Sequence, residues 1–330
     1  MRLRPLGKTG IQCSELGLGT WGLSGSAYGP VRSDEQDRVI ARARASGITL
    51  FETADIYGPS TSGVEDAHLG SASISDSMEA RLGRILGTDD RCCVVTKIGT
   101  DLGANPPRKC FTDAFLHHSF CASMARLNPR PLDVVLLHNP SLDVIVRGTA
   151  TAWLAERAEA GAVRSWGVSA GSAEVAQAAI DAGAPIVELA FNILWADDFR
   201  AIEQRAREAG TGLLARSVLA HGLLCGFWGL EQTFSDDDHR AARWTNADLR
   251  GRLRQLDALR PLIRGDVSTM RAAALRWVLG HDLVSSAVLG PRSCLQLDQL
   301  VREAGKEPPY LPPESFGALE SRLKDLGARP

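Results

Sequence analysis

In residues 48–58 a short apolar run is followed closely along the chain by a carboxylic acid and then a phenol. The run predicts a buried strand that stops at Glu52, and Tyr57 follows five residues later, just before a glycine–proline turn signal. Phenol is a poor acid near neutral pH, because its reference pKa is about 10. It becomes a useful proton donor only when a cation and other polar groups lie against it. We therefore interpret Tyr57 as a candidate proton donor whose partners come from elsewhere in the chain.

Two later segments have the composition needed to supply those partners, because each is a short apolar run that ends in one ionisable residue, Lys97 or His138. Side chains of a barrel strand alternate between the interior and the outer helices. Glu52, Lys97 and His138 each end a strand on this pattern, which predicts that a carboxylate, an ammonium and an imidazole meet at one rim. Taken singly, Tyr57 and Lys97 also fit packing or a surface position, and His138 fits a core histidine.

Strands and helices alternate along almost the whole chain. Strands are expected near residues 16–19, 48–52, 92–97, 132–138, 163–169, 186–191, 213–217 and 284–289. Helices are expected near residues 33–46, 64–86, 112–126, 147–160, 173–182, 197–209, 267–279 and 293–304. Several strands are almost entirely apolar, which is typical of a parallel sheet buried on both faces. With a small hairpin (2–6 and 11–13) ahead of them, these units predict an α/β fold. We expect a closed (β/α)8 TIM barrel as one domain over residues 1–330, rather than an open doubly wound sheet.

Residues 218–266 form a long insert after the seventh strand, far longer than the usual connection. Because the insert follows a strand, we expect it at the end of the barrel where catalytic residues lie. It contains a helix expected near residues 246–260 and the aromatic residues Phe227, Trp228 and Trp244. We interpret the acidic residues 236–238 as a solvated loop tip, because a metal site would need more converging oxygen ligands.

The composition is that of an ordinary soluble globular protein, with 44% hydrophobic residues, 23% charged residues and a net charge of −2. Such a charge does not indicate nucleic acid or an acidic membrane surface as a partner. The first residues are polar, no run approaches the length of a membrane span, and the seven cysteines lack paired metal-ligand spacing. We therefore expect a cytoplasmic protein with reduced thiols, a small-molecule substrate and no metal.

Several motifs follow one another along nearly the whole chain. They are residues 6–10 (LGKTG), 17–22 (GLGTWG), 53–58 (TADIYG), 96–97 (TK), 137–140 (LHNP), 167–169 (GVS), 217–224 (SVLAHGLL) and 290–293 (GPRS). In this order they resemble the aldo-keto reductase family, in particular its bacterial NADP-dependent oxidoreductases. The resemblance implies a barrel enzyme that moves hydride between a nicotinamide cofactor and a carbonyl group. It also implies that Tyr57 protonates the carbonyl oxygen, Lys97 lowers the pKa of Tyr57, His138 polarises the carbonyl and Glu52 holds Lys97.

Three positions depart from the pattern of the family. Glu52 stands where the family usually has Asp, which shifts the carboxylate by about 1 Å. Ala170 and Glu188 replace the Asn and Gln that normally hold the carboxamide of nicotinamide, and a carboxylate accepts hydrogen bonds but does not donate them. We therefore expect Ser169 to act as the donor. Phe191 replaces the commoner Tyr and is expected to stack on the nicotinamide ring.

The resemblance also implies where the rest of the cofactor binds. The residues expected to line the pyrophosphate and the adenosine end are Ser217, Val218, Leu219, Gly222, Gly290, Arg292, Ser293 and Gln296. Backbone N–H groups at Gly290 and at the helix start offer a place for a phosphate. Arg292 and Ser293 are expected to hold a 2′-phosphate, which favours NADPH over NADH because guanidinium binds phosphate well.

The leading interpretation is NADPH-dependent, reversible reduction of an aldehyde or ketone to an alcohol. Trp21, Tyr28 and Trp228 are expected to contact a substrate that is apolar or carries a ring. One alternative is an NAD(P)-dependent sugar 1-dehydrogenase, and another is a non-catalytic regulatory subunit that binds the nicotinamide cofactor. The departures at positions 52, 170 and 188 leave the second alternative open, whereas the intact Tyr57, Lys97 and His138 argue against it.

Overall fold

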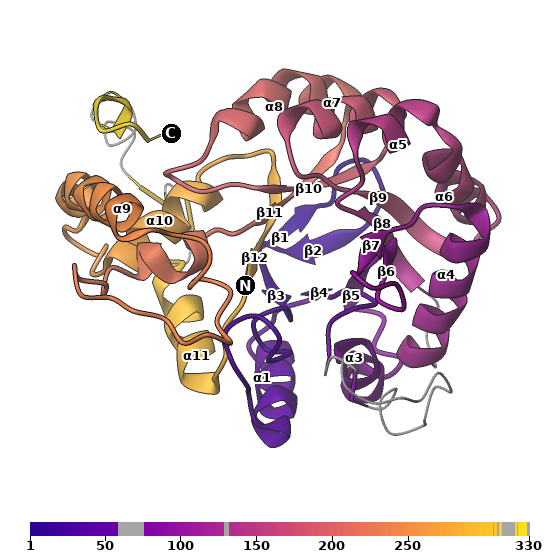
Figure 1. Ribbon diagram of the computed structural model, residues 1–330, viewed down its shortest axis with the longest axis horizontal. Coiled ribbons are helices and arrows are strands. Elements are labelled where there is room, and N and C mark those ends of the chain that lie inside the picture. The colour runs from indigo at the N-terminus through magenta and orange to yellow at the C-terminus, as the bar shows by residue number, and fades with distance from the viewer. Residues whose placement is uncertain are drawn as a thin grey trace.

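Eight parallel strands form a closed barrel at the centre of the molecule (Figure 1). This computed structural model describes residues 1–58, 76–128, 132–305, 307–308, 310–311, 321 and 323–328. The barrel strands are β3 (Leu16–Gly19), β4 (Leu50–Glu52), β5 (Cys93–Ile98), β8 (Leu132–His138), β9 (Val163–Ser169), β10 (Ile186–Ala190), β11 (Gly212–Arg216) and β12 (Val284–Leu289). Each strand pairs with the next along the chain, and β12 pairs with β3 to close the sheet. The predicted (β/α)8 barrel is therefore confirmed.

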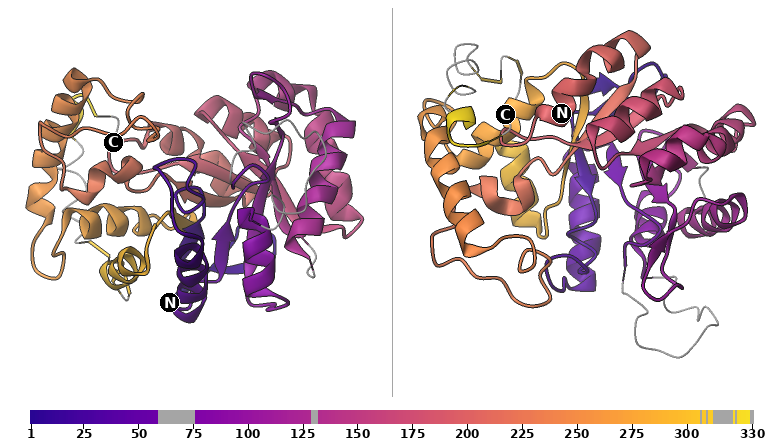
Figure 2. Two further views of the ribbon diagram at one scale, coloured as in Figure 1. Left: turned by 60° about the horizontal axis from the view of Figure 1, so that its bottom comes forward. Right: turned by 45° about the horizontal axis from the view of Figure 1, so that its top comes forward.

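Helices between the strands cover the outside of the barrel, as the two further views show (Figure 2). They are α1 (Ser33–Ala45), α3 (Met78–Leu86), α4 (Asp113–Leu127), α5 (Leu142–Arg147), α6 (Thr149–Glu159), α7 (Ala173–Asp181), α8 (Asp197–Ala209), α10 (Met270–Leu279) and α11 (Cys294–Glu303). Of the helix expected near residues 64–86, the part 64–75 lies outside the described residues. Within the part of the chain that the structure describes, no helix has the length and apolar character needed to span a membrane.

Outside the insert after β11, two short features were not expected from the sequence. The first is a small hairpin of β6 (Thr100–Asp101) and β7 (Arg108–Lys109), which follows β5 on the same side of the barrel as the strand ends. The second is α5, which begins where the hydroxyl of Ser141 accepts the N–H of Val144 and ends at Gly148, whose φ is 76°. Elements of two to six residues are too short to show a hydrophobic period, so the sequence pattern does not reveal them.

The interior of the barrel is filled by alternate side chains of the strands. Leu50, Val95 and Leu136 belong to one inner hydrophobic cluster, and each lies two residues before an ionisable residue at the end of its strand. The alternation of barrel strands therefore directs Glu52, Lys97 and His138 inward as well. The amino-terminal hairpin of β1 (Leu3–Pro5) and β2 (Gln12–Ser14) contributes flanking residues to the same cluster, so it closes the opposite end of the barrel.

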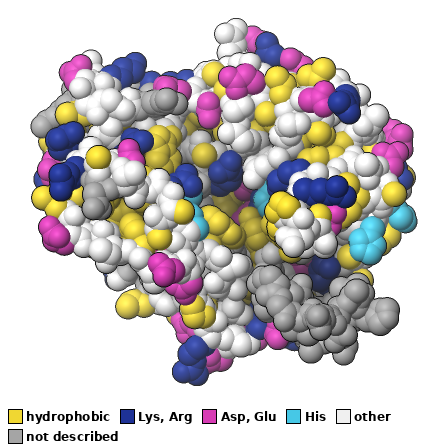
Figure 3. Space-filling model, viewed as in Figure 1, with side chains coloured by type: hydrophobic (Ala, Val, Ile, Leu, Met, Phe, Trp, Pro, Cys, Tyr) yellow, Lys and Arg dark blue, Asp and Glu magenta, His cyan; other side chains and the backbone are white. Residues whose placement is uncertain are grey.

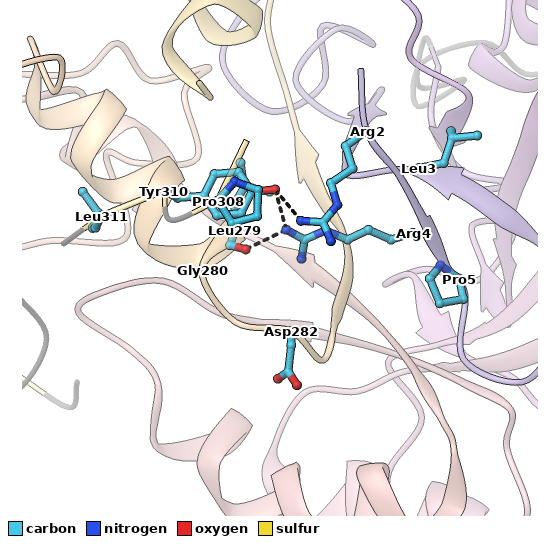
Figure 4. A pocket seen from close by; sticks show the side chains of 10 residues that line it. All are labelled: Arg2, Leu3, Arg4, Pro5, Leu279, Gly280, Asp282, Pro308, Tyr310 and Leu311. Atoms are coloured by element: carbon cyan, nitrogen blue, oxygen red, sulfur yellow. Dashed lines mark hydrogen bonds between the residues drawn. The ribbon is translucent and has the colours of Figure 1, made fainter. Parts of the chain in front are cut away.

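A buried cation ties this closed end together. Arg4 donates hydrogen bonds to the backbone oxygens of Val284 at 2.8 Å and Leu279 at 2.7 Å, and to the hydroxyl of Tyr310 at 3.0 Å. Glu15 pairs with the guanidinium at 3.5 Å and accepts a hydrogen bond from the Tyr310 hydroxyl. These contacts join the first strand to β12, α10 and the C-terminal segment, beside a pocket of about 540 Å³ (Figure 4).

The insert after β11 packs beside the opposite, open end of the barrel. It contains two short 3-10 helices, η1 (Ala220–Cys225) and η2 (Arg260–Leu262), and the helix α9 (Asn246–Leu259). Backbone contacts join it to the loop after β3. Tyr28 and Asp238 form an isolated antiparallel β-bridge, and the N–H of His239 donates to the backbone oxygen of Ala27 at 2.9 Å. Arg240 lies over the ring of Tyr28 at 4.9 Å, so the two loops form one continuous wall.

Candidate active site

A cavity of about 780 Å³ opens at the carboxyl ends of the strands, where the active sites of (β/α)8 barrels lie. Its wall includes residues from the ends of all eight strands or from the loops that follow them, together with the insert. Figure 3 shows a central hollow with Lys, Arg and His side chains at its edge. The cavity is large enough to hold an extended ligand rather than only a small substrate.

Four of the residues singled out in the sequence lie together in this cavity. Lys97, which is 1% exposed, forms an ion pair with Glu52 and donates to the hydroxyl of Tyr57 at 3.3 Å. The ammonium also donates to the backbone oxygen of Thr53 at 3.0 Å. The rings of Tyr57 and His138 are 6.1 Å apart and almost perpendicular, at 84°. The structure thus brings the carboxylate, ammonium, phenol and imidazole into one group.

Backbone hydrogen bonds hold the loop that carries Tyr57 against β5. The N–H of Asp55 donates to the oxygen of Lys97 at 3.0 Å, and the N–H of Tyr57 donates to Ala54 at 3.0 Å. The backbone carbonyl oxygen of Tyr57 in turn accepts a hydrogen bond from the N–H of Met78, the first residue of α3, at 2.8 Å. The phenol is therefore fixed by the same strand that supplies its cation.

The extra methylene of Glu52 is accommodated by a glycine. A Cβ atom at Gly19 would lie 3.0 Å from Oε2 of Glu52 and 2.9 Å from a side-chain carbon of Val288. The absence of a side chain at this position therefore leaves room for the longer carboxylate beside Lys97.

Burial decides the protonation states of the group. Burial raises the pKa of Tyr57 above its ordinary value, the charge of Glu188 adds to this effect, and Arg216 opposes it. The ammonium of Lys97 therefore does not bring the pKa of Tyr57 below that of a free phenol, in contrast to our expectation from the sequence. The reason is that the loss of hydration destabilises a buried phenolate more than the nearby cations stabilise it. The phenol remains protonated near neutral pH, which is the form that a proton donor needs.

The cation and the imidazole respond to burial in the same direction. Burial lowers the pKa of Lys97 to about 8, although the carboxylate of Glu188 opposes the shift. Burial, together with the positive charge of Lys97, lowers the pKa of His138 well below its ordinary value. His138 is therefore a neutral imidazole, which has one N–H to donate and one nitrogen to accept. At neutral pH the group contains one cation, one neutral imidazole and one protonated phenol.

Two of the residues expected at the nicotinamide end line the cavity, and one does not. Ser169 and Glu188 face it from β9 and β10. Phe191 does not face it: this ring stacks on Phe199 with centroids 3.9 Å apart and packs against Trp277 in the outer helical layer. The prediction for Phe191 is therefore wrong. The alternation along β10 gives the physical reason: Glu188 and Ala190 face the cavity, and Phe191, the next residue after Ala190, takes the opposite face.

A cation that the sequence analysis did not single out stands at the same end of the cavity. Arg216 ends β11, lines the cavity and donates to the backbone oxygen of Ala170 at 2.9 Å. The signal for it was present, because residues 213–216 are an apolar run that ends in one ionisable residue, like the runs before Lys97 and His138.

Most residues expected to bind the remainder of a cofactor also line the cavity. These are Ser217, Val218, Leu219, Gly222, Gly290, Arg292 and Gln296. Ser293 is not among the lining residues, because its hydroxyl caps α11 by accepting the N–H of Gln296 at 3.2 Å. At the same helix start the carboxylate of Glu35 accepts the N–H of Cys294 at 2.9 Å.

The aromatic residues expected to contact the substrate, Trp21, Tyr28 and Trp228, all line the cavity. The rings of Trp21 and Tyr28 meet edge to face at 5.5 Å. The structure adds Trp195, Lys109, Arg240 and Arg243 to the wall, which the sequence pattern did not indicate. Within the described residues, no group of three or more His, Cys, Asp or Glu side chains is arranged to hold a metal ion.

Comparison with known proteins agrees with the family resemblance of the sequence motifs. A family model described as "Aldo/keto reductase family" matches residues 15–321. The chain is 28% identical to L-glyceraldehyde 3-phosphate reductase of Escherichia coli K12 over 92% of this chain and 87% of that protein.

Two solved structures resemble the fold over almost the whole length of both chains. The glycerol dehydrogenase AKR11B4 of Gluconobacter oxydans has a TM-score of 0.78 and 23% identity, and covers 99% of this chain and 97% of its own. The holo form of the aldo-keto reductase AKR11C1 of Bacillus halodurans has a TM-score of 0.76 and 20% identity, with 100% and 97% covered. At this identity the two structures support the fold alone.

Proposed function

The chain belongs to the aldo/keto reductase family, and we propose that it reduces an aldehyde or ketone to an alcohol with NADPH as the hydride donor. The observation that carries the proposal is the group formed by Tyr57, Lys97, His138 and Glu52 at the mouth of the barrel. Its members come from three strands and one loop, yet they share one cavity. This complete group favours an active enzyme over a non-catalytic subunit.

Each member of the group has a task that follows from its protonation state. Tyr57 is a protonated phenol and donates its proton to the carbonyl oxygen as that oxygen gains negative charge. Lys97 stabilises the phenolate that remains, because its ammonium lies 3.3 Å from the phenol oxygen. His138 is neutral and faces the same cavity, so it donates a hydrogen bond that orients and polarises the carbonyl. Glu52 holds Lys97 in place.

The residues around the cavity fit a nicotinamide cofactor, which supplies the hydride when it is bound. The observation that tests the fit is Glu188, whose two carboxylate oxygens are buried and make no hydrogen bond to the described residues. A buried acceptor without a donor is costly, and the amide hydrogens of a carboxamide would satisfy it. Gly222, Gly290 and Gln296 line the other part of the cavity, where the remainder of the cofactor would extend.

The preference for NADPH rests on Arg292. Its guanidinium donates from one terminal nitrogen to the oxygens of Gly29 at 2.7 Å and Pro30 at 3.1 Å, and its Nε is buried without a partner among the described residues. The group is therefore held in place through one terminal nitrogen, while the other terminal nitrogen makes no hydrogen bond to the described residues and can donate to a 2′-phosphate. Because Glu35 already accepts the N–H of Cys294, Arg292 is the donor on which binding of that phosphate depends.

The aromatic part of the cavity wall favours a substrate that is apolar or carries a ring. Trp21 and Tyr28 line the cavity from the loop after β3, and Trp228 lines it from the insert. Aromatic side chains of this kind recognise apolar or flat groups through large contact areas.

The experiment that tests the proposal is a turnover assay with a panel of aliphatic and aromatic aldehydes, using NADPH or NADH. We expect turnover with NADPH, a higher Kd for NADH, and a loss of this preference in Arg292→Ala. Arg205→Ala is the matched control, because Arg205 lies on α8 in an exposed pair with Asp181 and does not line the cavity. No turnover with any aldehyde would contradict the proposed reaction. An Arg292→Ala variant with an unchanged preference would contradict the assignment of the phosphate.

A further inference from the structure

Glu188 is an unusual residue at the bottom of a ligand cavity. Its side chain is 1% exposed, and neither carboxylate oxygen makes a hydrogen bond to the residues that the structure describes. The nearest cation is Nζ of Lys97, 3.9 Å away, and that ammonium already serves Glu52, Thr53 and Tyr57. Burying a carboxylate without hydrogen bonds is costly. The position is therefore built for a ligand that brings its own donor.

Arg216 supplies the complementary chemistry on the neighbouring strand. Its partner across the sheet is Ala190, whose small side chain leaves room for the guanidinium to pass in front of β10. On the far side the guanidinium donates to the backbone oxygen of Ala170, at the end of β9, at 2.9 Å. Arg216 thus spans the three strands β9, β10 and β11, above Glu188, and lines the same cavity.

Most of the donors of Arg216 remain available. A guanidinium has five N–H donors, and one hydrogen bond to the described residues is observed here. The remaining donors belong to a partly exposed side chain in the cavity wall. Ala170 offers no side-chain donor and the hydroxyl of Ser169 has one hydrogen to donate, so Arg216 is the cation that brings several donors to this end of the cavity.

We propose that Glu188 and Arg216 together recognise the carboxamide group of the nicotinamide ring. Glu188 accepts hydrogen bonds from the carboxamide NH2, and Arg216 donates to the carboxamide oxygen. A carboxamide both donates and accepts, so two charged residues of opposite character match it as well as a pair of neutral amides does. The inference rests on the proposed use of a nicotinamide cofactor. It adds Arg216 to the site and explains how an acceptor-only residue at position 188 is compatible with binding.

The test is a comparison of dissociation constants for three ligands, measured by calorimetry on the intact protein without substrate. The ligands are NADP+, its 3-acetylpyridine analogue, and 2′-phospho-ADP-ribose, which lacks the ring. The acetyl group keeps the oxygen of the carboxamide but replaces its NH2 by a methyl group. It therefore removes the contact to Glu188 and keeps the contact to Arg216.

The variants are expected to separate the two contacts. In Glu188→Leu, binding of NADP+ weakens roughly tenfold or more, as expected for a lost hydrogen bond to a charged group, and binding of the acetylpyridine analogue changes little. In Arg216→Met, both ring-bearing ligands weaken by a similar factor. Glu188→Gln restores the binding of NADP+, because an amide also accepts. Binding of 2′-phospho-ADP-ribose stays within about twofold of the wild type throughout, as does every ligand in the control Arg205→Met.

Two results would overturn the assignment while leaving the proposed reaction intact. The first is an Arg216→Met variant that weakens 2′-phospho-ADP-ribose as much as NADP+, because Arg216 would then support the cavity or the pyrophosphate rather than the ring. The second is a Glu188→Leu variant that still discriminates against the acetylpyridine analogue as the wild type does. If the wild-type protein bound none of the three ligands, the proposed function would fall together with this assignment. Arg216→Lys, which keeps a cation at this position, checks that the loss in Arg216→Met does not come from misfolding.

Discussion

At the open end of the barrel, Glu52, Lys97 and Tyr57 combine a buried carboxylate, a cation and a phenol. At the closed end, Glu15, Arg4 and Tyr310 combine the same three kinds of group. Both sets are almost free of solvent contact at their charged residues, so composition and burial alone do not tell them apart.

The partners of the two sets differ. At the closed end the two terminal nitrogens of Arg4 donate to three backbone oxygens as well as to Tyr310, and these bonds join distant parts of the chain. At the open end the neighbours of Lys97 are left incomplete, since Glu188 and Nδ1 of His138 are buried without hydrogen bonds to the described residues. At the closed end Nε of Arg4 is also buried without a partner, but the carboxylate of Glu15 is hydrogen-bonded within the chain. The two ends therefore differ at the carboxylate: one that the chain satisfies by itself stabilises the fold, whereas Glu188, which makes no hydrogen bond to the described residues, indicates a ligand site.

The sharpest way to test this difference is to make the same change at both ends. Tyr57→Phe removes the proton donor, so we expect kcat for aldehyde reduction to fall by about 10²–10⁴ while the midpoint of urea unfolding changes little. Tyr310→Phe, the matched control, should leave kcat within about twofold, because Tyr310 is remote from the cavity. A Tyr57→Phe variant that retains wild-type turnover would remove the distinction between the two ends.

Removal of the cation at the closed end should cost stability rather than activity. Arg4→Met leaves Glu15 buried without its cation, so we expect the free energy of unfolding to fall by about 3–5 kcal/mol. The kcat of the folded protein should be unchanged. Urea titration followed by circular dichroism, with kcat measured at low urea, checks both parts. A loss below about 1 kcal/mol would show that the Arg4 network does not hold the barrel closed.

Removal of the hydroxyl at the closed end should have a smaller effect of the same kind. Tyr310→Phe leaves one oxygen of Glu15 and one donor of Arg4 without that partner, which should lower the free energy of unfolding by about 1–3 kcal/mol. In the double variant with Arg4→Met, the free energy of unfolding should fall by less than the sum of the two single losses, because the residues share one network. Full additivity would mean that Tyr310 acts independently of Arg4.

The sequence predicted the open end well because its signal is local. An apolar run that stops at one ionisable residue fixes both the end of a strand and the inward face, which is why Glu52, Lys97 and His138 were placed together. The same rule applied to residues 213–216 would have found Arg216. Phe191 was misplaced because one residue decides which face a side chain takes, and the end of β10 was predicted one residue too far.

The closed end could not be predicted in this way. Glu15 and Arg4 are 11 residues apart, and Tyr310 lies 295 residues beyond Glu15, in a segment without a periodic pattern. Only the closure of the barrel brings the first strand, α10 and the C-terminal segment together. The contacts of the insert with the loop after β3 have the same origin, because the bridge between Tyr28 and Asp238 depends on tertiary packing and not on either local sequence.

The smallest expected effect that separates the two ends is a dependence of kcat on pH, which arises at the open end. Lys97 has a pKa of about 8, so it is charged below that pH and loses its proton above it. The charged form stabilises the phenolate of Tyr57, so kcat for reduction at saturating NADPH should fall about tenfold between pH 7 and pH 9. Burial also raises the pKa of Asp55 to about 8, so Asp55→Asn is the necessary control. If the fall persists in Asp55→Asn, Lys97 is the titrating group; if it disappears, the ammonium is not the group that limits proton transfer.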